Sequence, residues 1–236
     1  GHRVMGLAER GLVDMFLPVS QAVAIGNGLV GSRLPFQVVH NFIPDDVGIQ
    51  ADEIEPYLSE LPTGDYLLFV GALSRQKGVD VLLRAYTDLT NAPPLVLIGY
   101  PTQEWSILSA DCPTNVFVFK NWPRHAVMEA WRHSLLALLP AVGPESCPTV
   151  VMEAMWAGRP VIASRIGGLV DLVAEGETGL LVEPGNSAAL REAIERLLAD
   201  PGLRLRMGQA ALSKVVGFRA STVVPRIEQV YEQVLL

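Results

Sequence analysis

The chain has 236 residues, half of them hydrophobic, and a formal net charge of −7. This length supports one large core, or one core with a small second unit. No apolar run approaches the roughly 20 residues that span a bilayer, and the two cysteines, Cys112 and Cys147, suggest neither a disulfide framework nor a metal site. We therefore expect a soluble cytoplasmic protein without a bound metal. The absence of a basic patch with interleaved aromatic residues argues against a nucleic-acid partner.

The first 43 residues contain two apolar stretches and one helix signal. We expect strands over residues 13–19 and 36–43, and a short helix capped by Ser20 that fails at the glycines from Gly26 to Gly31. This is too little to form a core alone. Either these elements extend the main sheet, or they are the last piece of a domain that the chain lacks.

The acidity of the chain is concentrated in one segment. Between positions 34 and 74 there is no Lys or Arg but there are seven acidic residues, while the other 18 acidic residues are balanced by 18 basic ones. The segment also contains Pro44, Pro56, Pro62 and Gly64. We therefore expect a solvated linker over residues 44–64.

After this segment, apolar runs alternate regularly with helical patterns. The expected strands are residues 66–71, 95–99, 115–119, 135–140, 160–163 and 179–182, and the expected helices include residues 79–89, 126–133 and 188–198. Such alternation predicts an α/β fold with a parallel sheet covered by helices on both faces. The tail, residues 201–236, has helical periodicity alone, with a break near Gly217 and Phe218.

The sequence PESCPTVVMEAMWAGRP, residues 144–160, carries both ends of a helix. Pro148 suits the first helical position, and Gly158 suits the left-handed conformation that ends a helix after Ala157. Glu145 then lies in the loop before the helix, at the carboxyl edge of the sheet where ligands bind in such folds, and Glu153 lies inside the helix. The free amides of the first turn, on Thr149, Val150 and Val151, favour an anion. The alternative is a solvated loop acid and a polar helix position.

A second loop, GALSRQKG over residues 71–78, joins the first strand of this sheet to its helix. Lys77, and with it Arg75, stands where a helix begins, and a cation there is disfavoured by roughly 0.3–1 kcal/mol. A bound phosphate would offset this cost, as would the carboxylate of Asp80. The loop matches neither the dinucleotide fingerprint nor the P-loop.

In combination, four motifs resemble the carboxyl-terminal, donor-binding domain of the retaining glycosyltransferases of family 4, which have the GT-B fold. They are FVGALSRQKGVDVLLRA, the Glu145 to Glu153 spacing, IGGLVDLV and TGLLVEPG, and the likeness runs from about residue 65 to the end. FLPVSQAV and VVHNFIP resemble the end of the family's other Rossmann-like domain. The resemblance implies a remnant of that domain over 1–43, a linker over 44–64, a Rossmann-like nucleotide-sugar domain over 65–217 and a terminal helix over 218–236 that packs back on the amino-terminal part.

The resemblance also implies roles for individual residues. Lys77 and Glu145 would be catalytic: Lys77 stabilises the departing diphosphate, and Glu145 contacts hydroxyls of the donor sugar. Glu153 would accept hydrogen bonds from the ribose. The other implied donor-binding residues are Gly71, Arg75 and the amide-bearing Ser146, Cys147, Thr149 and Val150. No metal or cofactor is implied, and the partners are a UDP-, GDP- or ADP-linked sugar and a sugar, lipid-linked or small-molecule acceptor.

Two positions depart from the family pattern. Ala72 stands where the family usually has an Arg directly after the strand glycine, so one of two diphosphate cations is absent, and Arg75 in the same loop is the candidate to replace it. Asp171 stands where the family more often has Glu. Arg124 and His125 follow a strand end near the family's base site, although a lone His at a helix start is more often a surface residue. Cys147 at a helix start has a reason for a lowered pKa, but no general base is near it in sequence.

The resemblance implies a hexosyltransferase that moves a sugar from a nucleotide diphosphate to an acceptor hydroxyl with retention. The isolated chain should be inactive, because most of the acceptor domain is missing; a peripheral membrane contact through that domain is left open. Two alternatives remain. One is a non-catalytic nucleotide-sugar-binding module, favoured by Ala72, and the other is a nucleotide-sugar epimerase of GT-B architecture, disfavoured by the spacing of Glu145 and Glu153.

Overall fold

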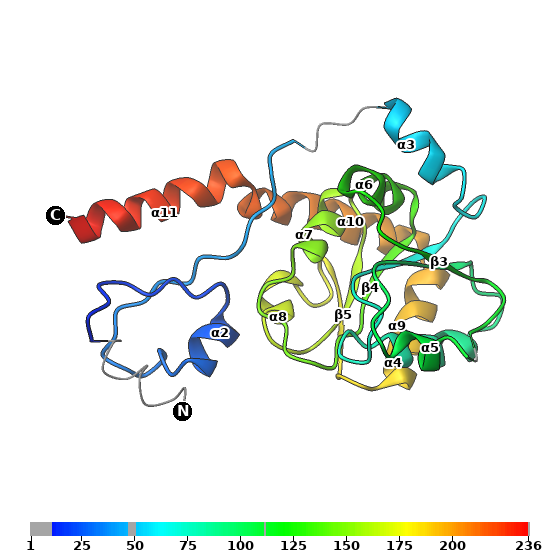
Figure 1. Cartoon of the computed structure of the whole chain (residues 1–236), viewed down its shortest axis with the longest axis horizontal. Helices are drawn as coiled ribbons and strands as arrows, with labels where there is room; N and C mark the ends of the chain where they lie inside the picture. The colour runs from blue at the N-terminus through cyan, green and yellow to red at the C-terminus, as the bar shows by residue number, and fades with distance from the viewer. Residues whose placement is uncertain (1–10, 47–50, 111, 236) are drawn as a thin grey trace.

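The chain folds around a six-stranded parallel sheet with the strand order β3-β2-β1-β4-β5-β6. Figure 1 shows the whole chain, with helices around this sheet. The computed structural model describes residues 11–46, 51–110 and 112–235. The strands are β1 (Leu67–Val70), β2 (Leu95–Ile98), β3 (Val116–Phe119), β4 (Leu136–Leu139), β5 (Val161–Ser164) and β6 (Gly179–Val182). All six predicted strands are confirmed, each within one residue of its expected bounds.

The apolar runs form these strands because both faces of the sheet are covered. Every residue of β2, β4 and β5 is buried, as expected for a parallel sheet between two helix layers. β1 lies at the centre and pairs with β2 on one side and β4 on the other. The expected α/β fold class, a Rossmann-like sheet with helices on both faces, is confirmed.

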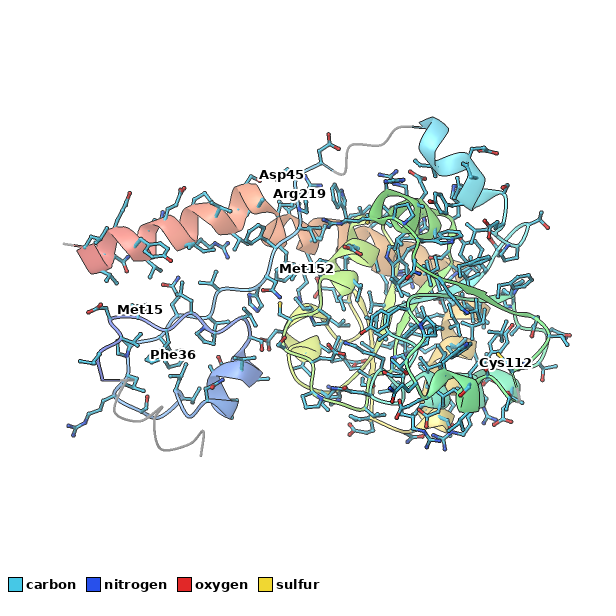
Figure 2. The ribbon with its side chains drawn as sticks, viewed as in Figure 1. Met15, Phe36, Asp45, Cys112, Met152 and Arg219 are labelled. Atoms are coloured by element: carbon cyan, nitrogen blue, oxygen red, sulfur yellow. The ribbon has the colours of Figure 1, made fainter. Side chains whose placement is uncertain are left out.

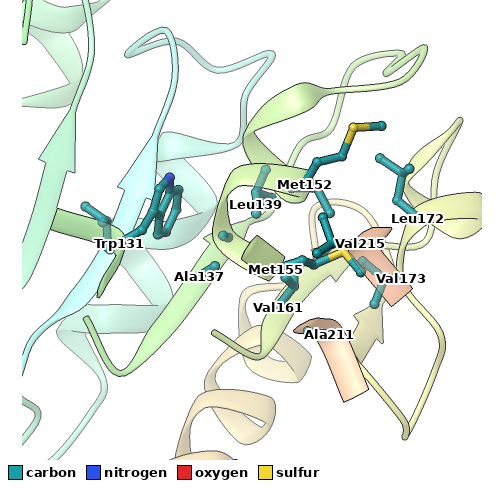
Figure 3. Packing of buried hydrophobic residues seen from close by; sticks show 14 of the residues in the cluster. Trp131, Ala137, Leu139, Met152, Met155, Val161, Leu172, Val173, Ala211 and Val215 are labelled. Atoms are coloured by element: carbon teal, nitrogen blue, oxygen red, sulfur yellow. The ribbon is translucent and has the colours of Figure 1, made fainter. Parts of the chain in front are cut away.

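Alternate residues along each strand point to opposite faces of the sheet, and each face packs on its own layer of helices. One face packs on α4 (Val79–Thr87) and α9 (Ser187–Ala199). The other packs on α6 (Arg124–His133), α7 (Thr149–Trp156) and α10 (Pro201–Val215). Figure 3 shows this second core, in which side chains of α7 meet those of α10 and β5. Two short helices, α5 (Trp105–Leu108) and α8 (Leu169–Leu172), complete this part of the fold.

The amino-terminal segment differs from the prediction. Ser20 caps α2 (Gln21–Gly26) as expected, but residues 13–19 and 36–43 form no strands. They meet in one isolated parallel bridge between Phe16 and Phe36. A strand needs a continuous neighbouring ladder, which two short extended stretches cannot provide. Neither stretch joins the six-stranded sheet, so the alternative that they extend it is excluded. The predicted amino-terminal piece begins at residue 1, and residues 1–10 lie outside the described part.

The tail breaks where the sequence predicted. After α10, a short 3-10 helix, η1 (Val216–Phe218), leads into α11 (Ala220–Leu235), which lies beside the amino-terminal segment in Figure 1. The two parts are tied by backbone hydrogen bonds from Ile43 to Phe218 and from Ala220 to Ile43. Ser221 also donates to the carboxylate of Asp45, which Figure 2 shows near the start of α11.

The acidic segment contains a helix that we did not predict, α3 (Ala51–Leu58). Ile54 is buried, and Tyr57 meets the ring of Trp122 edge-on at 5.3 Å. The expectation of a wholly solvated linker is therefore wrong for this helix, because two apolar side chains among the acids are enough to dock one turn onto its neighbour. Residues 47–50 of the segment lie outside the described part. In the part of the chain described, no helix is long and apolar enough to cross a membrane.

Candidate functional site

Two loops at the carboxyl edge of the sheet are held against each other by their backbones. The carbonyl of Gln76, after β1, accepts hydrogen bonds from the amides of Val142 and Gly143, after β4, at 3.0 and 2.9 Å. Gly78 has φ 74°, and a Cβ there would lie 1.8 Å from the carbonyl oxygen of Pro140. Only glycine fits this approach, which brings the loop bearing Lys77 next to the loop bearing Glu145.

The side chains of Lys77 and Glu145 form an ion pair, with 2.5 Å between Nζ and Oε1. Glu145 is only 10% exposed in its side chain and Lys77 is 36% exposed. The cost of a cation at the start of α4 is thus met by Glu145. The alternative partner, Asp80, instead pairs with Arg84 one helical turn later, so the expectation that it offsets Lys77 is wrong.

A cavity of about 300 Å³ opens beside this pair. Gly71 and Ala72 line it from the β1 loop, and Thr149 and Val150 line it from the start of α7. Its apolar walls come from Phe69, Tyr100, Leu139, Ala141 and Leu169. The cavity therefore combines one cation, one carboxylate and a helix start within a mostly apolar lining, the composition of a small-molecule site.

The helix start supplies two free amides rather than three. Pro148, which we expected to be the first residue of the helix, instead directly precedes α7. After the helix, Gly158 has φ 70°, in the left-handed region. The amide of Val151 is already bonded to the carbonyl of Pro148 at 3.2 Å. Among the described residues, the amides of Thr149 and Val150 donate to no protein group, and both residues line the cavity. Free amides at a helix start favour an anionic ligand.

A third loop fixes the position of Glu145. The amide of Gly168 donates to the carbonyl of Glu145 at 2.7 Å. A Cβ on Gly167 would lie 2.1 Å from that carbonyl oxygen, and one on Gly168 would lie 1.9 Å from the carbonyl oxygen of Ser146. The paired glycines of IGG are a sequence signal for a close backbone approach, but they do not indicate which residue is approached.

Glu153 lies inside α7 and is 7% exposed. Its Oε1 is 3.2 Å from Nη2 of Arg124, the first residue of α6. Burial raises the pKa of the Glu153 carboxyl, and the Arg124 charge opposes this rise. Glu153 does not line the Lys77 cavity. It lies further along α7, whose first residues, Thr149 and Val150, do line it.

Three of the predicted donor-binding residues, Arg75, Ser146 and Cys147, do not line the cavity that contains Lys77. Arg75 lines a different hollow with Asp80 and Arg84, which gives no support to Arg75 as the second cation of the cavity. Ser146 and Cys147 do not line the cavity either. Cys147 is buried, and burial raises the pKa of its thiol, so the helix start does not lower that pKa as the sequence suggested.

His40 has a partner that the sequence did not reveal. Its Nε2 is 3.6 Å from Oδ2 of Asp171, and the same oxygen accepts a hydrogen bond from the amide of Gln21 at 2.7 Å. Asp171 belongs to α8, directly after the glycines that contact Glu145 and Ser146. The amino-terminal segment therefore docks on the loop that positions Glu145.

Residues 52–214 match the family model described as glycosyl transferases group 1. The chain belongs to this family. It is 33% identical over 188 residues to the D-inositol 3-phosphate glycosyltransferase of Acidothermus cellulolyticus, covering 73% of this chain and 42% of the relative. It is 30% identical over 178 residues to the enzyme of the same name from Corynebacterium diphtheriae, covering 70% of this chain and 42% of that relative. The chain thus spans less than half the length of these curated relatives.

Solved structures share the fold of this glycosyl transferase domain. Sucrose-phosphate synthase from Thermosynechococcus elongatus superposes with a TM-score of 0.81 at 22% identity, over 97% of this chain and 61% of that one. The Anabaena protein HepE, solved in complex with UDP and glucose, superposes with a TM-score of 0.83 at 20% identity, over 98% of this chain and 66% of that one. These likenesses establish the GT-B type of Rossmann-like fold.

Proposed function

We propose that this chain is the donor-binding part of a retaining glycosyltransferase of family 4 type, which transfers a sugar from a nucleotide diphosphate to an acceptor hydroxyl. The observation that carries the proposal is the cavity in which Lys77, Glu145 and the free amides of Thr149 and Val150 meet. A diphosphate needs a cation and amide donors, and a sugar needs hydrogen-bond acceptors such as Glu145. Family membership supports the same reaction class.

The two ends of the donor would lie on different residues of this edge. The diphosphate would lie between Lys77 and the start of α7, with Gly71 leaving room for it beside β1. The sugar hydroxyls would reach Glu145 and the amides near Ser146 and Cys147. The ribose hydroxyls would reach Glu153.

In the reaction, the bond from the anomeric carbon to the diphosphate oxygen breaks while a bond to the acceptor oxygen forms on the same face. The acceptor proton leaves with the diphosphate. Lys77 stabilises the negative charge that grows on the leaving oxygen. Without a donor, Glu145 forms an ion pair with Lys77. Binding of the diphosphate to Lys77 would free Glu145 to accept hydrogen bonds from the sugar hydroxyls. No metal is required in this scheme.

The acceptor belongs to the part that the curated relatives have and this chain lacks. We propose that residues 1–43 are the end of that other domain, residues 65–217 the donor domain, and residues 218–236 a helix returning to the amino-terminal part. The hydrogen bonds that join Ile43 to the start of α11 support this division. Because transfer takes place between two domains, the isolated chain should bind a donor weakly and transfer nothing.

The test is calorimetric titration of UDP, GDP and ADP, and their sugar conjugates, into the chain. UDP is the first choice because HepE was solved in complex with UDP and with UDP-glucose. Saturable binding by one nucleotide, lost in Lys77→Ala and in Glu153→Ala, is the expected result. Arg84→Ala is the matched control, since this cation on α4 pairs with Asp80 outside the cavity. Failure of every nucleotide to bind the folded chain, or loss in the control as well, would contradict the proposal.

Ala72 supports a second candidate, a donor-binding module without catalysis, because it lines the cavity where the family places a second cation. The two candidates differ in the full-length protein. A catalytic protein transfers a labelled sugar to an acceptor. A binding module holds the nucleotide sugar and releases no labelled product with any acceptor.

A further inference from the structure

Arg124 stands in an unfavourable place unless it has a partner. It is the first residue of α6, after Pro123, where the helix dipole disfavours a cation. No described residue of the first turn of α6 is acidic. Its partner comes from α7 instead: Nη2 of Arg124 is 3.2 Å from Oε1 of Glu153. The pair joins the two helices at the carboxyl edge of the sheet.

Glu153 depends on this partner more than Arg124 does. The side chain of Glu153 is 10% exposed and that of Arg124 is 43% exposed. A buried carboxylate is costly when it is ionised, whereas a half-exposed guanidinium remains solvated. Glu153 must nevertheless be ionised to accept hydrogen bonds from two ribose hydroxyls, because a protonated carboxyl turns one of its oxygens into a donor.

The other charged groups near α7 form no ion pair with Glu153 among the described residues; Arg219, for example, lies over the ring of Trp156. Arg159, just after α7, donates to the carbonyl of Ser134. On α10, Lys214 donates to the carbonyl of Asp171, and the Asp171 carboxylate on α8 faces His40 and Gln21. On α6, His133 and Arg132 pair with Glu129. Within the described residues, Arg124 is thus the charge that pairs with the Glu153 carboxylate.

We propose that Arg124 is a positioning residue that holds the buried carboxylate of Glu153 ionised and oriented to accept from the ribose hydroxyls of the donor nucleotide. This rests on the proposed function, which assigns the ribose to Glu153. Arg124 acts through Glu153. The Arg124 side chain is 43% exposed and does not line the Lys77 cavity, so we expect its removal to act on the carboxylate of Glu153.

The first test reads Glu153 without any ligand. Carbon-13 NMR of glutamate-labelled chain follows the side-chain carboxyl of Glu153 between pH 4 and 9, with its signal assigned by its absence in Glu153→Gln. We expect the pKa of Glu153 to rise in Arg124→Gln and to return close to the wild-type position in Arg124→Lys. Arg132→Gln, which removes another paired arginine of α6, is the matched control and should leave the signal unchanged. An unchanged titration in Arg124→Gln overturns the proposal.

The second test connects this charge to the nucleotide. UDP affinity is measured from pH 6 to 9. The phosphate of UDP also titrates in this range, so each protein is compared with Glu153→Gln, in which only the phosphate titration remains. In Arg124→Gln we expect a loss of roughly tenfold for each unit by which the pKa of Glu153 exceeds the working pH, with recovery at high pH. UDP that lacks the ribose 2′-hydroxyl should show a smaller dependence.

The outcomes separate the two proposals. A loss in Arg124→Gln that is equal at every pH would mean a structural role or a direct substrate contact, and would overturn the positioning role. Normal UDP affinity in Glu153→Gln would instead contradict the assignment of the ribose to Glu153, and with it the proposed function. The NMR titration decides the effect of Arg124 on the carboxylate in either case.

Discussion

The amide of Gly168 donates a hydrogen bond to the carbonyl of Glu145, with 2.7 Å between nitrogen and oxygen. Gly168 lies in the loop after β5 and Glu145 lies in the loop after β4. Their hydrogen bond holds the Glu145 loop in position at the edge of the sheet. The Glu145 side chain can then reach Lys77 on the third loop. Gly167 and Gly168, just before α8, thus help to hold Glu145 beside the cavity, although neither glycine lines it.

Replacing Gly168 with Ala should displace the Glu145 loop. The new Cβ would lie 1.9 Å from the carbonyl oxygen of Ser146, and a backbone atom cannot move away as a flexible side chain does. We expect a loss of about 1–3 kcal/mol in the free energy of unfolding, together with weaker nucleotide binding. Denaturant unfolding and calorimetry measure the two effects. Gly217→Ala is the control, since nothing lies within 4 Å of its Cβ position; equal losses in both variants would contradict this account.

The Lys77–Glu145 pair should show strong coupling. Lys77→Ala leaves the 10% exposed Glu145 carboxylate without its cation, and we expect a cost of about 1–3 kcal/mol in unfolding free energy. Glu145→Gln in the same chain removes the unpaired charge and should restore most of that stability. Nucleotide binding should stay lost in the double variant, because the cation is still absent.

The measurement is a double-mutant cycle by urea unfolding, with nucleotide titration of all four proteins. Additive stability losses would show that the two side chains do not interact. Recovery of nucleotide binding in the double variant would show that Glu145 only competes with the ligand, so that Lys77 is not needed to hold it.

The sequence predicted the elements of this fold better than the contacts between them. The six strands followed from their apolar runs, and the bounds of α7 followed from Pro148 and Gly158, because these signals are local. The pairing of Lys77 with Glu145, 68 positions apart, depends on β1 and β4 being neighbours in the sheet, which no local pattern encodes. The same holds for Arg124 and Glu153, which lie on different helices, α6 and α7.

The wrong expectations have physical causes of the same kind. Residues 13–19 and 36–43 have the composition of strands, but within the described residues they pair with each other only in the isolated bridge between Phe16 and Phe36. For these two stretches the neighbouring strands, and not the residues themselves, decided the outcome. The role of Arg75 stays a prediction, although Arg75 lines a different hollow from the Lys77 cavity.

Glu153→Gln should stabilise the fold while it removes nucleotide binding. Burial holds the pKa of Glu153 in the folded protein above its ordinary value, so ionisation costs more in the folded than in the unfolded state. That cost is absent below the ordinary pKa, where both states are protonated, and grows as the pH rises past it. At pH 7 we expect Glu153→Gln to have a larger unfolding free energy than wild type, a gain that disappears near pH 4, where both states of the wild type are protonated.

Thermal and urea unfolding at pH 4, 5, 6 and 7 would measure this difference between Glu153→Gln and wild type. Glu192→Gln, on the exposed side of α9, serves as the control and should give the same stability as wild type throughout. A Glu153→Gln variant that is less stable at pH 7 than at pH 4, relative to wild type, would have the opposite sign and would refute the argument.

Asp171→Ala should loosen the amino-terminal segment from the donor domain. One carboxylate oxygen of Asp171 accepts from the amide of Gln21 and faces His40, and no other side chain of α8 offers a charge to that segment. Hydrogen exchange followed by mass spectrometry should show faster exchange in α2, while β4 and β5 keep their protection. Because the two glycines that support Glu145 precede α8 and are unchanged in this variant, we expect nucleotide affinity to fall less than in Gly168→Ala. Asp80→Ala, which removes a carboxylate on α4 distant from that segment, is the control; unchanged exchange in α2 of Asp171→Ala would show that the contacts of Ile43 and Asp45 with the start of α11 hold the segment by themselves.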